Sequence, residues 1–150
     1  MLPQSVLLVE DNKDDEFLAL RMLRKAGITA IRFARDGQEA LDMLLASDQL
    51  LSEVVLLDLR LPLVDGLEVL AAIRRHKETK TLPVLVLTSS EDPLDKEVCS
   101  RLGVTAFLGK PLELSELRRA LTTLSPDRKN NSSSFQNSSK LVRNNGVSGL

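Results

Sequence analysis

Three acidic residues stand at the ends of two short apolar segments. Glu10 and Asp11 follow an apolar run that ends at Val9, and Asp58 follows the apolar residues 54–57. In an open parallel sheet, the carboxyl ends of the strands meet at one edge, and ligands bind in the crevice there. Carboxylates that crowd together repel one another and need a cation or protons. Mg²⁺ suits such a place, because it prefers hard oxygen ligands and binds through one or two carboxylates with phosphate and water.

Two more polar side chains follow later apolar segments. Thr88 ends the run 84–87, and Lys110 comes soon after the run 106–108. A carboxylate can attack a phosphoryl group and form an acyl phosphate. That reaction needs a metal to neutralise the developing charge and a lysine to hold the equatorial oxygens. These strand ends therefore outline a phosphorylation site, with Asp58 as the acceptor.

Each of these residues also has a purely structural interpretation. Glu10 and Asp11 could cap the helix that follows them. Thr88 could bond its own backbone in a loop, and Lys110 could be an ordinary surface lysine. Their coincidence at one edge of the sheet favours the chemical interpretation. The bond between Lys110 and Pro111 could be cis; the sequence does not decide this, and trans is the more frequent form.

The composition predicts one domain with an aliphatic core. The chain has 150 residues, of which 43% are apolar, with no Trp or Tyr and a formal net charge of −1. This charge argues against a nucleic-acid binder, and no apolar run approaches the roughly 20 residues of a membrane span. No secretory signal is visible at the N-terminus. The single cysteine, Cys99, is expected to pack rather than react, and it indicates the reducing cytoplasm as the location. The only histidine, His76, is interpreted as a solvated helix end.

Strand patterns and helix patterns alternate along the chain. Strands are expected over residues 5–9, 30–34, 54–57, 83–87 and 106–108, and helices over 14–26, 38–46, 66–76, from Asp92-Pro93 to 102, and along the stripe Leu114 to Leu124. Such alternation implies parallel strands, right-handed crossovers and helices on both faces. The prediction is an α/β fold, a doubly wound five-stranded parallel sheet with five helices of the flavodoxin type. The domain is expected over residues 1–124, with a polar, disordered tail over 125–150.

Taken in order, these motifs resemble the receiver domains of two-component response regulators. The resemblance covers about residues 5–124. The matching pieces are Val9-Glu10-Asp11-Asn12, Asp36-Gly37 with Glu39-Ala40-Leu41, Leu57-Asp58-Leu59 with Pro62 and Asp65-Gly66, Leu87-Thr88-Ser89 and Gly109-Lys110-Pro111.

The resemblance implies a role for each site residue. Asp58 would accept a phosphoryl group from a histidine kinase, and the protein would not be a dedicated enzyme, although it would lose the phosphate slowly by itself. The metal, Mg²⁺ with Mn²⁺ as a substitute, would be held by Glu10, Asp11, Asp58 and the backbone carbonyl of Arg60. Lys110 and Thr88 would contact phosphoryl oxygens, Phe107 would be the switching aromatic residue, and Arg60 and Ser90 would modulate the reaction.

The partners follow from the same resemblance. The fourth helix, the last strand and the fifth helix would form an output face that controls an unidentified protein. No effector pattern follows Leu124, so the chain looks like a stand-alone receiver of the chemotaxis or phytochrome-kinase-associated kind. Acidic residues 14–16 and the segment Leu59-Arg60-Leu61-Pro62 favour the second kind, with a phytochrome-type kinase as donor. Neither nucleic acid nor a membrane is expected as a partner, and homodimer formation is left open.

Three other functions fit the sequence less well. A pseudo-receiver keeps the fold without taking phosphate, but Asp58, Lys110 and the acid pair are all present. A phosphohydrolase of the haloacid-dehalogenase type carries a second aspartate two residues after its nucleophile, where this chain has Arg60. A dinucleotide-binding enzyme would show Gly-x-Gly-x-x-Gly after a strand, and the sequence has none.

Overall fold

Five parallel strands form one sheet. They are β1 (Ser5–Val9), β2 (Ala30–Ala34), β3 (Val54–Asp58), β4 (Val84–Thr88) and β5 (Ala106–Gly109), in the order β2-β1-β3-β4-β5. This order identifies the flavodoxin-like doubly wound fold and confirms the predicted fold class. The strand order reverses at the β1–β3 pair, in which Val9 lies opposite Leu57. The carboxyl ends of β1 and β3 are therefore neighbours at the topological switch point.

The computed structural model describes residues 2–46, 52–89 and 91–124. Residues 3–120 form one compact unit, and the described residues 2 and 121–124 belong to a second unit. The first unit contains the whole sheet and all helices except the last two residues of the fifth. The predicted tail, residues 125–150, lies outside the described residues, and its disorder stays a prediction.

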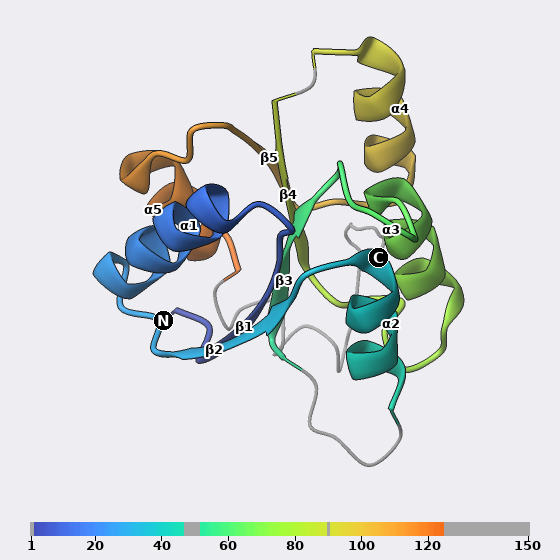
Figure 1. Cartoon of the computed structure of the whole chain (residues 1–150), viewed down its shortest axis with the longest axis horizontal. Helices are drawn as coiled ribbons and strands as arrows, with labels where there is room; N and C mark the ends of the chain where they lie inside the picture. Colours follow the sequence, from blue (N-terminus) through green and yellow to red (C-terminus); the bar gives the residue numbers. More distant parts are fainter. Residues whose placement is uncertain (1, 47–51, 90, 125–150) are drawn as a thin grey trace. The chain divides into compact units, whose positions relative to one another are not determined.

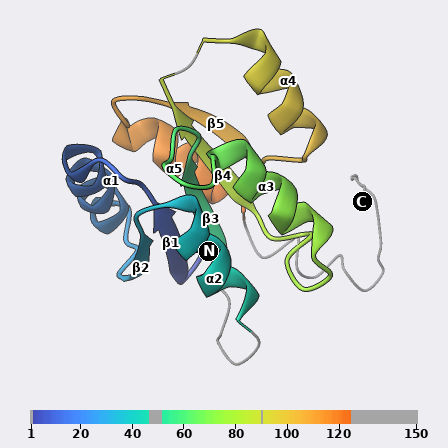
Figure 2. The same cartoon turned by 45° about the vertical axis from the view of Figure 1, so that its right-hand side comes forward.

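Helices cover both faces of the sheet. They are α1 (Lys13–Lys25), α2 (Gly37–Leu45), α3 (Gly66–Arg75), α4 (Pro93–Arg101) and α5 (Leu114–Thr122). Figure 1 shows α1 and α5 on one side of the sheet and α2, α3 and α4 on the other. In both views α4 lies beside α3, which it contacts (Figures 1 and 2). None of the helices in the described part is long and apolar enough to cross a membrane.

The first four helices begin at polar N-cap residues. The caps are Asn12, Asp36, Asp65 and Asp92, and each accepts a hydrogen bond from a backbone N–H in the first turn of its helix. Such caps satisfy donors that the helix itself leaves unpaired. The cap of α3 is a reciprocal capping box with Glu68. Asp92 caps α4 and Pro93 is its first residue, so this helix begins where the sequence predicts it.

The core is aliphatic, as the composition predicts. Every residue of β3 and β4 is buried, whereas the edge strand β2 buries only Ala34. These central strands read as continuous apolar runs because helices cover them on both sides. Helix α3 supplies the largest helical share of the core, with Val69, Leu70 and Ile73 fully buried. Asp58 and Thr88 are the last residues of these two buried strands.

The bounds of β1 and β2 match the predictions, and those of the other elements differ by at most two residues. Asp58 and Thr88 belong to β3 and β4 as their last residues, and α1 begins at Lys13 because Asn12 caps it. The Lys110-Pro111 bond, whose isomer the sequence left open, is cis.

The turn after β3 approaches the strand end so closely that residue 66 must be glycine. A Cβ on Gly66 would lie 2.5 Å from the carbonyl oxygen of Asp58 and 2.5 Å from Cα of Leu59. The N–H of Gly66 donates to the carbonyl of Leu59 over 3.0 Å. Both contacts are with backbone, which cannot move aside without displacing Asp58.

We expect Gly66→Ala to lower the free energy of unfolding by about 1–3 kcal/mol, because the new methyl group would overlap backbone atoms. Gly109→Ala is the matched control, since a Cβ at Gly109 would meet no atom within 4 Å. Urea titrations without metal measure the free energy of unfolding of both variants. Equal losses for the two variants would show that the close approach at Gly66 is unimportant.

Candidate functional site

Three carboxylates meet where β1 and β3 end. Glu10, Asp11 and Asp58 each offer an oxygen within 4.8 Å of the others. Glu10 is 1% exposed and Asp58 2% exposed, whereas Asp11 is open to solvent. The pairing of β1 with β3 places these residues side by side. The three acidic residues that the sequence predicted as one group therefore do form one group, with the composition of a divalent-cation site.

Lys110 extends into this cluster from the end of β5. Its Nζ lies 2.9 Å from Oδ2 of Asp15, 3.1 Å from Oδ2 of Asp58 and 3.3 Å from Oε1 of Glu10. Burial acts to lower the pKa of Lys110, but the hydrogen bonds to Asp15 and Asp58 and the charges of Asp58 and Glu10 outweigh it, so that the pKa is raised. The ammonium group is therefore a permanent positive charge in the site.

Glu10, one of the three clustered acidic residues, has a clearly raised pKa. Burial, followed by the hydrogen bond and the charge of Asp58, raises the pKa of Glu10 to about 8. The charge of Lys110 and the N–H of Asn12, at 3.3 Å, offset this only in part. The buried Oε1 of Glu10 lies 3.3 Å from the ammonium group of Lys110, but within the described part of the chain it accepts no hydrogen bond. A buried oxygen in this state is suited to a cation.

Asp15 is a member of the site that the sequence reasoning missed. The helix cap places it, since Oδ1 of Asn12 accepts a hydrogen bond from the N–H of Asp15 over 2.9 Å. The sequence interpretation used Asp15 only as one of the acidic residues 14–16. Its place in the first turn of α1, which begins soon after Glu10 and Asp11, was the available signal.

Thr88 lies at the end of β4, between the strands that carry Asp58 and Lys110. Its Cα pairs with Gly109, the residue before Lys110, and the side chain is buried. Phe107 is partly buried and packs against the core. Ser90, a predicted modulator, lies outside the described residues. The structure thus brings Thr88 to the same strand edge as Asp58 and Lys110.

Arg60 is the other predicted modulator. Its backbone N–H donates to Oδ1 of Asp58 over 3.0 Å, whereas its exposed side chain points to α4, where it pairs with Asp95 at 3.4 Å. The two oxygens of Asp58 therefore have different donors, Arg60 for Oδ1 and Lys110 for Oδ2. This pair of contacts fixes the orientation of the carboxylate.

Two residues that were given structural interpretations fit them. Cys99 is fully buried, and burial together with the charge of Asp95 raises the pKa of its thiol to about 11. A thiol in this state is a poor nucleophile. His76 is exposed and caps the end of α3, with Nδ1 3.0 Å from the carbonyl oxygen of Ala72.

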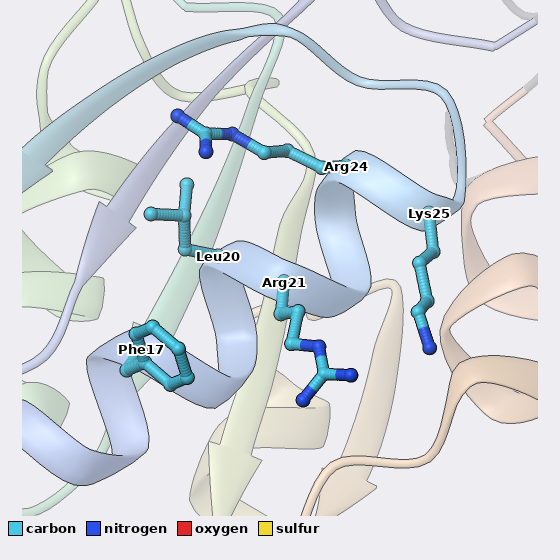
Figure 3. Close-up of a pocket in the computed structure, with 5 residues that line it drawn as sticks. All are labelled: Phe17, Leu20, Arg21, Arg24 and Lys25. Atoms are coloured by element: carbon cyan, nitrogen blue, oxygen red, sulfur yellow. The ribbon is translucent and has the colours of Figure 1, made fainter.

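A groove of about 400 Å³ lies on α1 (Figure 3). It is lined by Phe17, Leu20, Arg21, Arg24 and Lys25. The 13 residues of α1 span about 20 Å, so the basic end of this groove is far from the acidic cluster at the start of the helix. The groove is a separate surface with the opposite charge.

Comparison with known proteins agrees with the geometry. The family model for the response regulator receiver domain matches residues 6–122. The chain is 41% identical to the probable methanogenesis regulatory protein FilR2 of Methanothrix harundinacea, with 79% of each protein covered. It is 36% identical to the response regulator Rcp1 of Synechocystis sp., over 77% of this chain and 82% of that protein.

Solved structures give the same result. The Mn²⁺-bound form of Rcp1 aligns with a TM-score of 0.68 at 33% identity, over 83% of this chain and 93% of that one. The bacteriophytochrome response regulator AtBRR aligns with a TM-score of 0.71 at 40% identity, over 81% of this chain and 92% of that one.

The raised pKa of Glu10 predicts how stability depends on pH without metal. Because the folded state holds this proton up to about pH 8 and the unfolded chain releases it near 4.5, stability should fall as pH rises between these values. Glu10→Gln carries no titrating group there. The difference in the free energy of unfolding, wild type minus Glu10→Gln, should fall by at least about 1 kcal/mol from pH 5 to pH 8.5 in urea titrations with chelator. A constant or rising difference would contradict the raised pKa.

Proposed function

The chain belongs to the response regulator receiver domain family, and we propose that Asp58 accepts a phosphoryl group from the phosphohistidine of a histidine kinase. The observation that carries this proposal is the buried carboxylate of Asp58 with Lys110 at 3.1 Å and two further acids beside it. Receiver domains of two-component systems are phosphorylated by histidine kinases.

The transfer is a nucleophilic displacement at phosphorus. An oxygen of Asp58 forms the new bond to phosphorus while the bond between phosphorus and the donor's imidazole nitrogen breaks. The electron pair of the broken bond stays on the imidazole, which leaves as neutral histidine after taking a proton. Lys110, with its raised pKa, neutralises charge on the transferred oxygens. The donors to Asp58 hold the attacking carboxylate in one orientation.

The residues present fit a divalent cation. Receiver domains bind Mg²⁺ or Mn²⁺ at an acidic pocket, and here Glu10, Asp11 and Asp58 with the carbonyl of Arg60 would hold the ion. The buried Oε1 of Glu10, which lacks a hydrogen bond among the described residues, supports this assignment. When bound, the ion neutralises negative charge that gathers on the phosphoryl oxygens. Glu10 must lose its proton to take part.

Phosphorylation would then alter the output face. The added charge would draw in the hydroxyl of Thr88, and Phe107 on β5 would follow. The position of Thr88 beside Gly109, one residue before Lys110, supports this coupling. The exposed apolar residues Leu94 and Val98 on α4 provide a surface for an unidentified target protein. Thus the output would be binding rather than catalysis.

The donor would be a kinase of the phytochrome type, which the likeness to a bacteriophytochrome response regulator supports. The cytoplasm is the proposed location, where such a transfer takes place. A pseudo-receiver that never takes phosphate is the alternative, and no feature of the site favours it, since all the acidic residues and Lys110 are in place.

We expect incubation with acetyl phosphate and Mg²⁺ to add one phosphoryl group to the wild type and none to Asp58→Asn, because the amide is not a nucleophile. Asp42→Asn, which changes an exposed acid on α2, is the matched control and should react like wild type. Intact mass spectrometry measures all three. Equal phosphorylation of wild type and Asp58→Asn would reject Asp58 as the acceptor.

Lys110→Ala should still bind Mg²⁺, with equal or higher affinity, because the variant removes a cation that competes for the same carboxylates. It should nevertheless fail to switch. Calorimetry measures Mg²⁺ affinity, and NMR follows Thr88 and Phe107 on addition of Mg²⁺ with beryllofluoride. Lys77→Ala, an exposed lysine, should resemble wild type in both. If Thr88 showed the same chemical-shift changes in Lys110→Ala as in wild type, Lys110 would not be required for the switch.

A further inference from the structure

Arg60 connects the site to helix α4. Its backbone N–H donates to Oδ1 of Asp58 over 3.0 Å. Its side chain is 66% exposed and extends to α4, where a guanidinium nitrogen lies 3.4 Å from Oδ2 of Asp95. One residue therefore contacts both the phosphoacceptor and the first turn of this helix.

Asp95 is placed so that its contact with Arg60 holds the first turn of α4. It lies in the first turn of α4, where the helix dipole favours negative charge, and its side chain is only 17% exposed. Cys99 is the one fully buried residue of α4, whereas Leu94 and Val98 are exposed. A helix with so little apolar anchoring depends more on its charged contacts than a well-buried one does.

A phosphoryl group on Asp58 would change the competition for Arg60. In the present contact, the guanidinium of Arg60 is largely exposed to solvent, and an ion pair with an exposed member is a weak class of interaction. The acyl phosphate brings about two negative charges and strong acceptor oxygens, with which a guanidinium forms two parallel hydrogen bonds. The backbone of Arg60 is already bound to Asp58, so the side chain can turn to the phosphoryl group without moving the loop.

We propose, on the basis of the proposed function, that Arg60 is a positioning residue that binds Asp95 in the unphosphorylated protein and the phosphoryl group after transfer. The exchange releases the first turn of α4 in the phosphorylated state alone. Arg60 thereby transmits charge at Asp58 to α4 by a route that does not involve Thr88 or Phe107.

The affinity of the full chain for Mg²⁺ with beryllofluoride, a mimic of the phosphoryl group, tests the exchange by calorimetry. Arg60→Gln should weaken binding about five- to tenfold, because a charged donor is lost. Asp95→Asn should strengthen it about two- to fivefold, because Arg60 no longer has to leave a carboxylate. Opposite changes in affinity for the two variants would indicate that Asp95 and the phosphoryl mimic compete for Arg60. A merely structural role would make both variants weaker.

Two controls separate competition from a general charge effect. In the Arg60→Gln background, Asp95→Asn should change the affinity no further. Glu97→Gln removes the same charge from the same helix and breaks the 2.8 Å pair with Arg101, and it should leave the affinity within about twofold of wild type. Equal strengthening by Asp95→Asn and Glu97→Gln, or weakening by Asp95→Asn, would overturn the exchange.

Hydrogen exchange at residues 93–97 tests the release of α4. Without beryllofluoride, Asp95→Asn should exchange as fast as wild type does with it, about two- to fivefold above free wild type. Unchanged protection would overturn the release. If wild type itself fails to bind Mg²⁺ with beryllofluoride, the proposed phosphoacceptor function fails. If wild type binds Mg²⁺ with beryllofluoride and the Arg60 and Asp95 variants bind it with the same affinity, only the proposed role of Arg60 is refuted.

Discussion

The excess of negative charge around Lys110 is the constraint on which the site depends. Oxygens of three carboxylates, from Asp15, Asp58 and Glu10, lie within 3.3 Å of one ammonium group, and Asp11 adds a fourth carboxylate to the cluster. A single positive charge cannot balance them in a place that is largely removed from water. Burial, followed by the hydrogen bond and the charge of Asp58, raises the pKa of Glu10, which keeps its proton to about pH 8. The metal-free site is thus held together by one lysine and one proton.

This arrangement needs an accurate scaffold, because carboxylates at such distances separate if the backbone is free to relax. The parallel pairing of β1 with β3 fixes Glu10 beside Asp58, and full burial of β3 leaves it no room to shift. The close approach at Gly66 holds the turn after Asp58 against the strand. The stability of the core offsets the electrostatic cost of the site.

The sequence was sufficient for most of the fold because local patterns and the final structure agree. Short apolar runs such as 54–57 and 84–87 indicated covered strands, and the pair Asp92-Pro93 marked the start of α4. The acidic group and Lys110 followed from the rule that parallel strands end at one edge.

Other features depend on side-chain direction and on contacts between distant segments, which no local pattern contains. Asp15 looked like an ordinary first-turn acid until the cap at Asn12 placed it against Lys110, 95 residues away in the sequence. The pair of Arg60 with Asp95 joins a loop to a helix in the same way. The isomer of the Lys110-Pro111 bond was also beyond the sequence, since either form is compatible with the same residues.

A proton, a metal ion and a phosphoryl group each change the excess of negative charge in the site, but not in the same direction. A proton on Glu10 or a divalent cation reduces the negative charge, whereas a phosphoryl group on Asp58 increases it. An increase must be answered by cations within reach, and Lys110 is already shared among three carboxylates. Arg60 is a second cation close to Asp58. Its present partner, Asp95, lies on α4, a helix of which Cys99 is the buried residue. Because drawing Arg60 inward removes a contact from that helix, a local change of charge at Asp58 becomes a change in how α4 is held.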